Sequence, residues 1–140
     1  MIRSFTGSMR YQTEVYQGPH RLLVAVEVLI GDSSAASTLL LDTGSEWCVL
    51  PEHIAGEAGY PGEINPRIPP LHSRFGLIYG RIERIPFRFV ADVGAELVLE
   101  ATCFVSEEWP GPPVLGWKGC LERMRFALDP ADETFYFAPL

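Results

Sequence analysis

The sequence has few cysteines, and this scarcity excludes a fold held together by disulfide bonds. Only Cys48, Cys103 and Cys120 occur among the 140 residues, and each is flanked by apolar neighbours. An odd number of cysteines in a chain without a recognisable secretory leader indicates reduced thiols. We therefore expect all three to act as small core residues, as buried free cysteines commonly do.

The chain also lacks a long apolar run and a concentration of positive charge. The longest apolar stretch, residues 22–30, is interrupted by Glu27 and is too short to span a bilayer. The net charge is −7 and the eleven basic residues are scattered, whereas binding to a phosphate backbone needs a concentrated positive surface. These features predict a cytoplasmic protein that binds neither membrane nor nucleic acid, folded as one domain over residues 1–140.

Residue patterns that hold metals or common cofactors are missing. His20, His53 and His72 are far apart, and the sequence contains no Cys-x-x-Cys or His-Glu-x-x-His pair. No glycine-rich loop matches a nucleotide-binding pattern, and Ser45 is not in the Gly-x-Ser-x-Gly turn of serine hydrolases. We expect no metal site and no cofactor.

Short apolar runs separated by turn residues indicate a mostly β protein. Leu, Val and Ile dominate the first run, and Gly31 and Asp32 end it with typical turn chemistry. Pro86 interrupts a later alternating segment, which favours an edge strand or a bulge there. The pattern predicts a closed or sandwiched β fold. Strands are expected at residues 22–30, 37–41, 47–50, 82–90, 97–105, 114–115, 125–128 and 134–138, and short helices at 51–59 and 119–124.

One segment, Leu-Leu-Leu-Asp-Thr-Gly-Ser at residues 39–45, places a carboxylate at the end of an entirely apolar strand. An acid in such a position is costly to desolvate unless its charge is shared or hydrogen-bonded. Gly44 allows the backbone to turn so that an amide points at Asp42, and Thr43 and Ser45 add hydroxyl donors. An ordinary turn has the same composition. The apolar strand before it and a second segment, Val-Leu-Gly at 114–116, favour a prepared carboxylate instead.

From residue 22 to residue 137 the chain resembles the retropepsin-like aspartic proteases. The resemblance is carried by the apolar strand ending in Asp-Thr-Gly-Ser, by a central hairpin, and by Val-Leu-Gly leading into a helix. It implies an all-β (mostly) fold, a closed acid-protease-type β barrel with one short C-terminal helix. Residues 1–20 lie outside the resemblance, and we assign them no role.

The resemblance also implies a role for each residue of the two segments. Asp42 corresponds to the catalytic aspartate, and Thr43 to the residue whose hydroxyl ties two active-site loops together across a dimer. Gly44 supports the loop and lines the substrate backbone, while Ser45 buttresses the carboxylate. Gly116 corresponds to the glycine that lets a second loop pack beneath the first.

Two further regions are compared with the family in the same way. Residues 71–80, around Phe75 and Gly76, lie where the family carries its substrate-covering hairpin, and we call this segment the flap. Retroviral members usually have an arginine after the glycine of the second segment, paired with an acid just past the first. Here Trp117 stands in that position, so the resemblance supplies no partner for Glu46 and the interface must be built differently.

A single Asp-Thr-Gly in the chain implies a homodimer. Aspartic-protease chemistry requires two carboxylates that share one proton, because like charges about 3 Å apart cannot both ionise. One carboxylate activates a water while the protonated partner polarises the scissile carbonyl. Two-fold symmetry supplies a second Asp42. The interpretation is an aspartic endopeptidase that acts on peptide or protein substrates, with activity that falls as pH rises and the shared proton is lost.

Two alternatives remain open from the sequence. One is a catalytically inactive, protease-like dimerisation or peptide-binding module, for which the altered flap and Trp117 are the motivation. The other is a β barrel that binds a small apolar ligand, with Asp42 only a turn residue.

Overall fold

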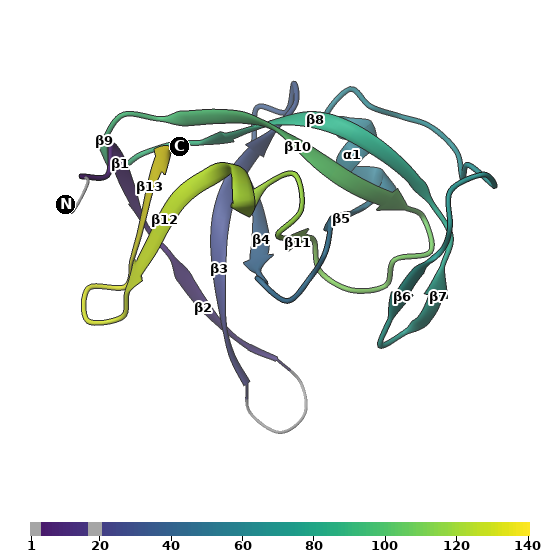
Figure 1. Ribbon diagram of the computed structural model, residues 1–140, viewed down its shortest axis with the longest axis horizontal. Helices are drawn as coiled ribbons and strands as arrows, with labels where there is room; N and C mark the ends of the chain where they lie inside the picture. Colours follow the sequence, from purple (N-terminus) through teal and green to yellow (C-terminus); the bar gives the residue numbers. More distant parts are fainter. Residues whose placement is uncertain (1–3, 17–20) are drawn as a thin grey trace.

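The computed structural model describes residues 4–16 and 21–140 and consists mostly of β-strands (Figure 1). None of the helices within these ranges has the length and apolar character needed to cross a membrane. The helical elements are α1 (Glu52–Glu57) and the 3-10 turn η1 (Leu121–Arg123). The strands are β1 (Gly7–Arg10), β2 (Gln12–Tyr16), β3 (Arg21–Ile30), β4 (Ser37–Leu41), β5 (Cys48–Pro51), β6 (Leu71–Ser73), β7 (Gly76–Ile78), β8 (Arg81–Phe89), β9 (Val93–Gly94), β10 (Leu97–Ser106), β11 (Val114–Leu115), β12 (Met124–Asp129) and β13 (Thr134–Pro139).

Six of these strands close a barrel, which confirms the predicted fold class. They pair in the order β3-β4-β11-β5-β10-β8, and β8 pairs back to β3 to complete the ring. Pro86 lies where the closing pair ends, because its carbonyl accepts the Gly31 N–H at 2.8 Å, just past the end of β3. The N and C=O of one strand residue face the same side, so the missing N–H of Pro86 faces the end of β3, and the ladder between β8 and β10 loses no bond at this residue. The edge strand or bulge expected at Pro86 does not form, because β8 is paired on both sides and stays in register with β10 through Pro86; the proline lies just past the end of the β3–β8 pairing.

A second sheet, with the order β12-β13-β1-β9, covers one side of the barrel, and we call it the terminal sheet. Alternation along β13 places Phe135 and Phe137 on its inner face, where both are fully buried. Their ring centroids lie 6.2 and 5.9 Å from that of Phe89 in the barrel wall. Burial of each such ring stabilises the fold by about 1.5–3 kcal/mol. Tyr136 points to the other face and contacts Phe5 at 5.7 Å.

The two predicted helices differ in outcome. Helix α1 forms within the predicted range 51–59, with Pro51 as the N-cap residue. The expected C-terminal helix at 119–124 is reduced to the single 3-10 turn η1. Gly119 has a positive φ of 70°, which an α-helix does not accept, and β12 already begins at Met124. Too few residues remain between these two points for a longer helix.

Residues 7–16, part of the segment to which the sequence assigned no role, supply strands to both sheets. β1 pairs with β13 and β9 in the terminal sheet, and β2 extends the barrel sheet from β3. Figure 1 shows the terminal sheet at one end of the molecule and the β6–β7 hairpin at the other. Strands β4 and β11, which carry the two motif segments, end between them.

Candidate active site

Asp42 directly follows β4, and its backbone is held by two hydrogen bonds. Its N–H donates to the Leu115 carbonyl at 3.0 Å, and its own carbonyl accepts the Ser45 N–H at 3.1 Å. The first bond continues the parallel pairing of β4 with β11, and the second closes a tight turn over residues 42–45. The position of the Asp42 backbone is therefore set by the barrel itself.

The Asp42 side chain is exposed and accepts one hydrogen bond from the turn. The Gly44 N–H donates to Oδ1 at 2.9 Å, as the sequence predicted for an amide freed by the glycine. A Cβ atom at position 44 would lie 3.2 Å from this same Oδ1, so any side chain there would crowd the carboxylate. The loop thus presents a charged oxygen at the surface with an amide dipole aimed at it.

The two hydroxyl residues of the loop do not support the carboxylate in the way that the sequence predicted. The Ser45 hydroxyl donates to the Trp47 carbonyl at 2.7 Å and not to Asp42. That bond stabilises the turn into β5 and leaves the carboxylate to the backbone amide. Thr43 is exposed, and its hydroxyl has no hydrogen-bond partner among the residues that the structure describes.

The second segment packs directly beneath the first, and Gly116 makes this possible. A Cβ atom at position 116 would lie 2.1 Å from the Trp47 carbonyl oxygen, a distance that only glycine avoids. Beyond it, the Trp117 N–H donates to the Ser45 carbonyl at 2.8 Å and the Lys118 N–H to the Glu46 carbonyl at 2.7 Å. These backbone bonds hold the two loops together as one rigid unit.

The family resemblance offered no basic partner for Glu46 at position 117. In the structure Glu46 forms an ion pair with the next residue, Lys118. Lys118 Nζ lies 3.7 Å from Glu46 Oε1, and the same ammonium group lies 5.1 Å from the centroid of the Trp47 ring. Both charged side chains are exposed, so the pair contributes little to stability. The family's ion pair with the residue after Gly116 is therefore absent, as expected from Trp117, and Lys118 supplies the basic partner of Glu46 instead.

The three cysteines gather in the core behind the two loops. All are fully buried and unpaired, as predicted, and the Cys48 sulfur accepts the Gly116 N–H at 3.3 Å. Hydrogen bonds from the Cys103 and Cys120 thiols lower the pKa of Cys48. Burial raises the pKa of Cys103, and the hydrogen bond to Cys48 raises that of Cys120. Cys103 and Cys120 therefore remain neutral in the core, and the Cys103 thiol donates to the Ala101 carbonyl at 3.7 Å.

A groove with a volume of about 990 Å³ runs from Asp42 to the flap. Its walls are largely apolar, and its polar groups include Asp42, Glu46 and His72. A groove of this size, with a carboxylate at its floor, can hold an extended segment of polypeptide. The apolar side chains that line it are Leu23, Leu40, Leu41, Trp47, Val49, Ile68, Leu71, Ile82, Phe104, Trp109 and Val114.

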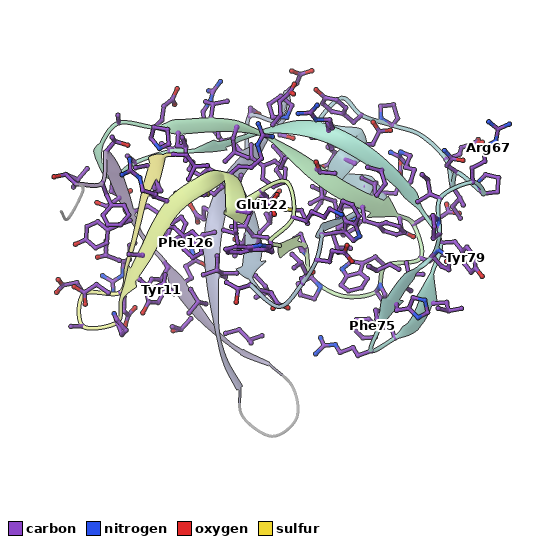
Figure 2. The ribbon with its side chains drawn as sticks, viewed as in Figure 1. Tyr11, Arg67, Phe75, Tyr79, Glu122 and Phe126 are labelled. Carbon is purple, nitrogen blue, oxygen red and sulfur yellow. The ribbon has the colours of Figure 1, made fainter. Side chains whose placement is uncertain are left out.

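The flap forms a hairpin of two short strands, which the residue pattern did not predict and only the family resemblance placed there. β6 and β7 pair through a turn at Arg74 and Phe75, and Gly76 follows it with a φ of 96°. Figure 2 shows Phe75 at the tip of the hairpin. Its ring meets that of Trp109 edge to face, with centroids 5.3 Å apart, and the Trp109 indole N–H donates to the Pro112 carbonyl at 2.8 Å. The tip is therefore held against the segment that leads into β11.

The base of the flap is anchored to the same part of the chain. The Tyr79 N–H donates to Glu108 Oε1 at 2.8 Å, and the Ser106 hydroxyl donates to the Tyr79 carbonyl. Next to it, the buried Arg81 is bonded to Glu52 and Glu83. The sequence did not reveal Trp109, Lys118 or Ser106 as parts of this region, because their partners lie far away along the chain.

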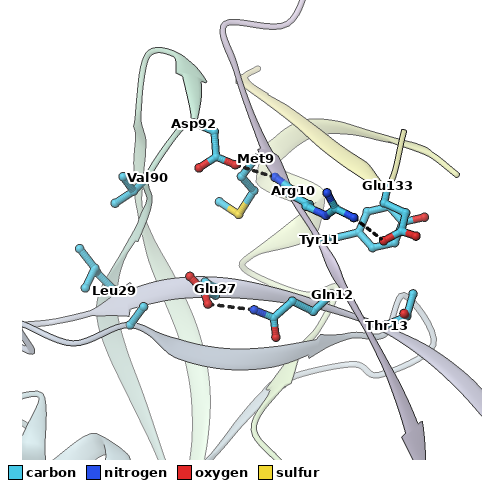
Figure 3. A pocket seen from close by; sticks show the side chains of 11 residues that line it. Met9, Arg10, Tyr11, Gln12, Thr13, Glu27, Leu29, Val90, Asp92 and Glu133 are labelled. Carbon is cyan, nitrogen blue, oxygen red and sulfur yellow. Dashed lines mark hydrogen bonds and ion pairs between the residues drawn. The ribbon is translucent and has the colours of Figure 1, made fainter. Parts of the chain in front are cut away.

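A second hollow, of about 670 Å³, lies between the terminal sheet and β3 (Figure 3). Its polar side chains are already paired with neighbours: Arg10 with Glu133 at 3.6 Å, and Gln12 with Glu27 at 2.9 Å. Asp92 accepts the Arg10 N–H at 2.8 Å. The hollow therefore presents a self-satisfied polar lining, in contrast to the exposed carboxylate of the groove.

The described residues contain no group of three or more His, Cys, Asp or Glu side chains arranged to hold a metal ion. The sequence matches no protein-family model, and no curated protein matches it significantly. Among solved structures, the chain is similar to a retropepsin-like aspartic protease from Rickettsia conorii. The TM-score is 0.52 and the sequence identity 14%, over 93% of this chain and 96% of that one. This similarity establishes the shared fold.

Proposed function

We propose that this protein is an aspartic endopeptidase whose active site forms when the Asp42 loops of two identical chains meet. The observation that carries the proposal is the exposed Asp42 carboxylate at the floor of an apolar groove, fixed by the barrel and bonded to the Gly44 amide. A single carboxylate lacks the protonated partner that this chemistry needs. An isologous dimer supplies it.

The residues of the loop have distinct roles in this proposal. One Asp42 carboxylate, deprotonated, takes a proton from a water as that water attacks the peptide carbonyl. The other, protonated, donates a hydrogen bond to the carbonyl oxygen. The exposed Thr43 hydroxyl is available to bond to the loop of the partner copy. Gly116 and the bonds from Trp117 and Lys118 keep the loop rigid, so that the two acids meet in a fixed geometry.

The groove indicates the class of substrate. Its apolar walls and its length between Asp42 and the flap fit an extended polypeptide segment with apolar side chains. The flap tip, held by Trp109, covers that segment from above.

One observation also favours a second candidate, a peptide-binding dimer without turnover. The flap is anchored at both its base and its tip, which restricts the opening that turnover requires. Binding without cleavage would use the same groove and the same two-fold arrangement.

The test is the Asp42→Asn variant, which preserves the shape of the side chain and removes its ability to act as a base. We expect cleavage of an unfolded protein substrate in mildly acidic buffer to fall by about a hundredfold or more, with the unfolding midpoint little changed. Asp132→Asn, a matched change at an exposed turn far from the loop, should cleave like the wild type.

Two outcomes would count against the endopeptidase. Equal cleavage by the wild type and Asp42→Asn would show that Asp42 is not the catalytic group. A stable wild-type dimer that binds unfolded polypeptide but cleaves none across the acidic range would favour the binding module.

A further inference from the structure

Arg81 is a charged residue buried at the base of the flap, one residue past its end, and is only 6% exposed. Its guanidinium donates through both Nη atoms to the Glu52 carboxylate, with Nη2 3.2 Å from Oε1, and through Nε to Glu83 Oε1 at 3.0 Å. Burial lowers the pKa of Arg81, but the bonds to Glu52 and Glu83 outweigh that effect and raise the pKa above its ordinary value. The group therefore remains charged inside the fold, as a buried ion does only when it is paired.

The guanidinium connects α1, the loop that leads toward the flap, and β8. Glu52 belongs to α1 and Glu83 to β8, and Nη2 also donates to the Tyr60 carbonyl of the loop at 2.7 Å. In the same loop the Gly62 N–H donates to Glu52 Oε1 at 3.1 Å, and a Cβ atom at position 62 would lie 2.7 Å from Arg81 Nε. A planar fork of donors can bond to two carboxylates and a carbonyl in this geometry, whereas a single ammonium group cannot.

Both arms of the flap are fixed beside this network. On the arm before the flap, the Asn65 N–H donates at 3.0 Å to the Gly80 carbonyl on the arm after it. A Cβ atom at position 80 would lie 2.3 Å from the Val105 carbonyl oxygen, so the second arm crosses β10 in close contact. Ser106, which is also buried, donates to the Tyr79 carbonyl. The base of the flap therefore moves only if several bonds break together.

The tip of the flap is held less firmly than the base. Figure 2 shows Tyr79 at the base and Phe75 at the tip. Phe75 is 43% exposed, and its contact with Trp109 is between two aromatic rings. Such a contact is weaker than a set of charge-assisted hydrogen bonds. The flap is thus a lid whose free end is its tip and whose fixed end lies at Arg81.

Strand alternation links the position of Arg81 to the groove. Arg81 and Val105 are paired across β8 and β10, and both line a hollow of about 300 Å³. Their neighbours Ile82 and Phe104 are also paired, and these side chains line the groove on the opposite face. Residues 68–74, which lead into and form the first part of the flap, line the groove as well. A shift of the backbone at Arg81 would therefore move the groove wall and the flap together.

We propose that Arg81 is a positioning residue for the substrate, because its bonds set the height of the flap above the groove and thereby the affinity for an extended polypeptide. Arg81 does not line the groove and takes no part in the chemistry at Asp42. The inference rests on the proposed function, since the polypeptide in the groove is the substrate there. An anchored flap can then still admit a chain, because the tip lifts while the base stays fixed.

The test compares Arg81→Lys with Arg84→Lys. Lysine keeps the positive charge at position 81 but cannot reproduce the fork. Arg84 lies on the same strand and pairs with Glu100 at 3.4 Å, with both side chains more than half exposed, so the same change there is the matched control. For cleavage of a fluorogenic peptide with apolar residues, we expect Arg81→Lys to raise KM by about five- to tenfold and to leave kcat within about twofold. Arg84→Lys should match the wild type in both constants.

Amide hydrogen exchange separates positioning from a general loss of stability. In Arg81→Lys, exchange should be about tenfold faster in residues 60–80 and unchanged in the terminal sheet, because only bonds around the flap base are lost. Glu52→Gln keeps the shape of the carboxylate but removes its charge, and should produce a smaller change of the same kind. It takes the place of Arg81→Lys if that variant does not fold.

Wild-type KM and wild-type exchange in Arg81→Lys would overturn the inference and leave the proposed function intact. Faster exchange throughout the chain, with a lower kcat and an unchanged KM, would also overturn it, because Arg81 would then only stabilise the fold. A wild type that cleaves nothing removes the endopeptidase, and the dissociation constant of the same peptide, measured by fluorescence anisotropy, then replaces KM. An increase of that constant in Arg81→Lys would support the positioning role, whereas an unchanged constant or an absence of binding would overturn it.

Discussion

At the scale of single residues, the region around Asp42 depends on short contacts between backbone atoms that side chains would prevent. Gly116 lies so close to the Trp47 carbonyl that a Cβ atom would stand 2.1 Å from its oxygen. We expect Gly116→Ala to lower the free energy of unfolding by about 1–3 kcal/mol or more, because backbone must move to relieve the overlap. Chemical denaturation of the two proteins measures this difference.

Gly56 offers the matched control for that substitution. It lies within α1, and a Cβ atom there would meet nothing within 4 Å. Gly56→Ala should therefore raise the free energy of unfolding by about 0.5–1 kcal/mol, because alanine is the better helix former. Equal effects of the two substitutions would contradict the close packing of the second loop beneath the first.

The buried thiols predict a loss of stability in alkaline solution. The raised pKa values of Cys103 and Cys120 keep both protonated in the folded state, whereas an unfolded chain releases those protons near pH 8.5, roughly the ordinary thiol value. The stabilising contribution is complete below that pH and is lost as pH rises, by up to about 1.4 kcal/mol per pH unit for each thiol. Cys48, whose pKa is lowered, contributes with the opposite sign: its stabilising contribution grows as pH rises toward the ordinary thiol value and is constant above it, so the loss due to Cys103 and Cys120 dominates above that value.

Urea unfolding under reducing conditions, at about pH 7.5 and about pH 9.5, spans the ordinary thiol range and tests this prediction. Cys120→Ala should show a shallower decline than the wild type, because one of the two thiols is gone. A wild-type stability that stays level or increases between the two pH values, relative to the variant, would be inconsistent with neutral thiols in the core.

The sequence predicted the bond from the Gly44 amide to Asp42 because these residues are neighbours in the chain. The close packing at Gly116 was implied only by the family resemblance, since its contact with Trp47 joins distant parts of the chain. The sequence did not predict that the Ser45 hydroxyl bonds to Trp47 or that Lys118 pairs with Glu46. Those contacts depend on how tightly the second loop packs under the first. The distance between the two loops cannot be predicted from a local pattern of residues.

At the scale of elements, the flap is the part whose attachment can be measured most simply. The edge-to-face contact of Phe75 with Trp109 is worth about 0.5–1.5 kcal/mol. We therefore expect Trp109→Ala to speed amide hydrogen exchange in residues 71–78 by about two- to tenfold, because the tip opens more often.

Phe5→Ala provides the comparison for this variant. Phe5 is also exposed and also contacts an aromatic ring, that of Tyr136 at 5.7 Å, but it belongs to the opposite end of the molecule. Flap exchange in Phe5→Ala should equal that of the wild type. If Trp109→Ala exchanges at the wild-type rate, the tip is not held by this contact.

Most strands of the barrel were predictable from their alternating or continuous apolar residues, and the turns from glycine and proline. The short C-terminal helix was not, because Gly119 and the start of β12 leave it a single turn. β2 was also missed, since its residues are mostly polar and it forms by pairing with the edge of β3. Whether such a strand forms depends on pairing with residues far along the chain, and the periodicity of the sequence does not reveal that pairing.

At the scale of the whole molecule, the barrel holds one Asp42 loop rigid and exposed between the terminal sheet and the flap. In the proposed function the chain supplies half of a symmetrical site, with the groove on one side of the loop. A second copy lying over the loop would complete that site. Assembly and catalysis would then respond to the same changes in concentration.

The most direct test of the shared Asp42 pair is a mixing experiment. Wild-type protein is held at a fixed concentration above its dimer dissociation constant, and Asp42→Asn is added in ninefold excess with time for chains to exchange. We predict that cleavage falls to about a tenth, because random pairing leaves only about one wild-type chain in ten with a wild-type partner. Cleavage that stays at its original rate after complete exchange would contradict an active site built from two Asp42 residues.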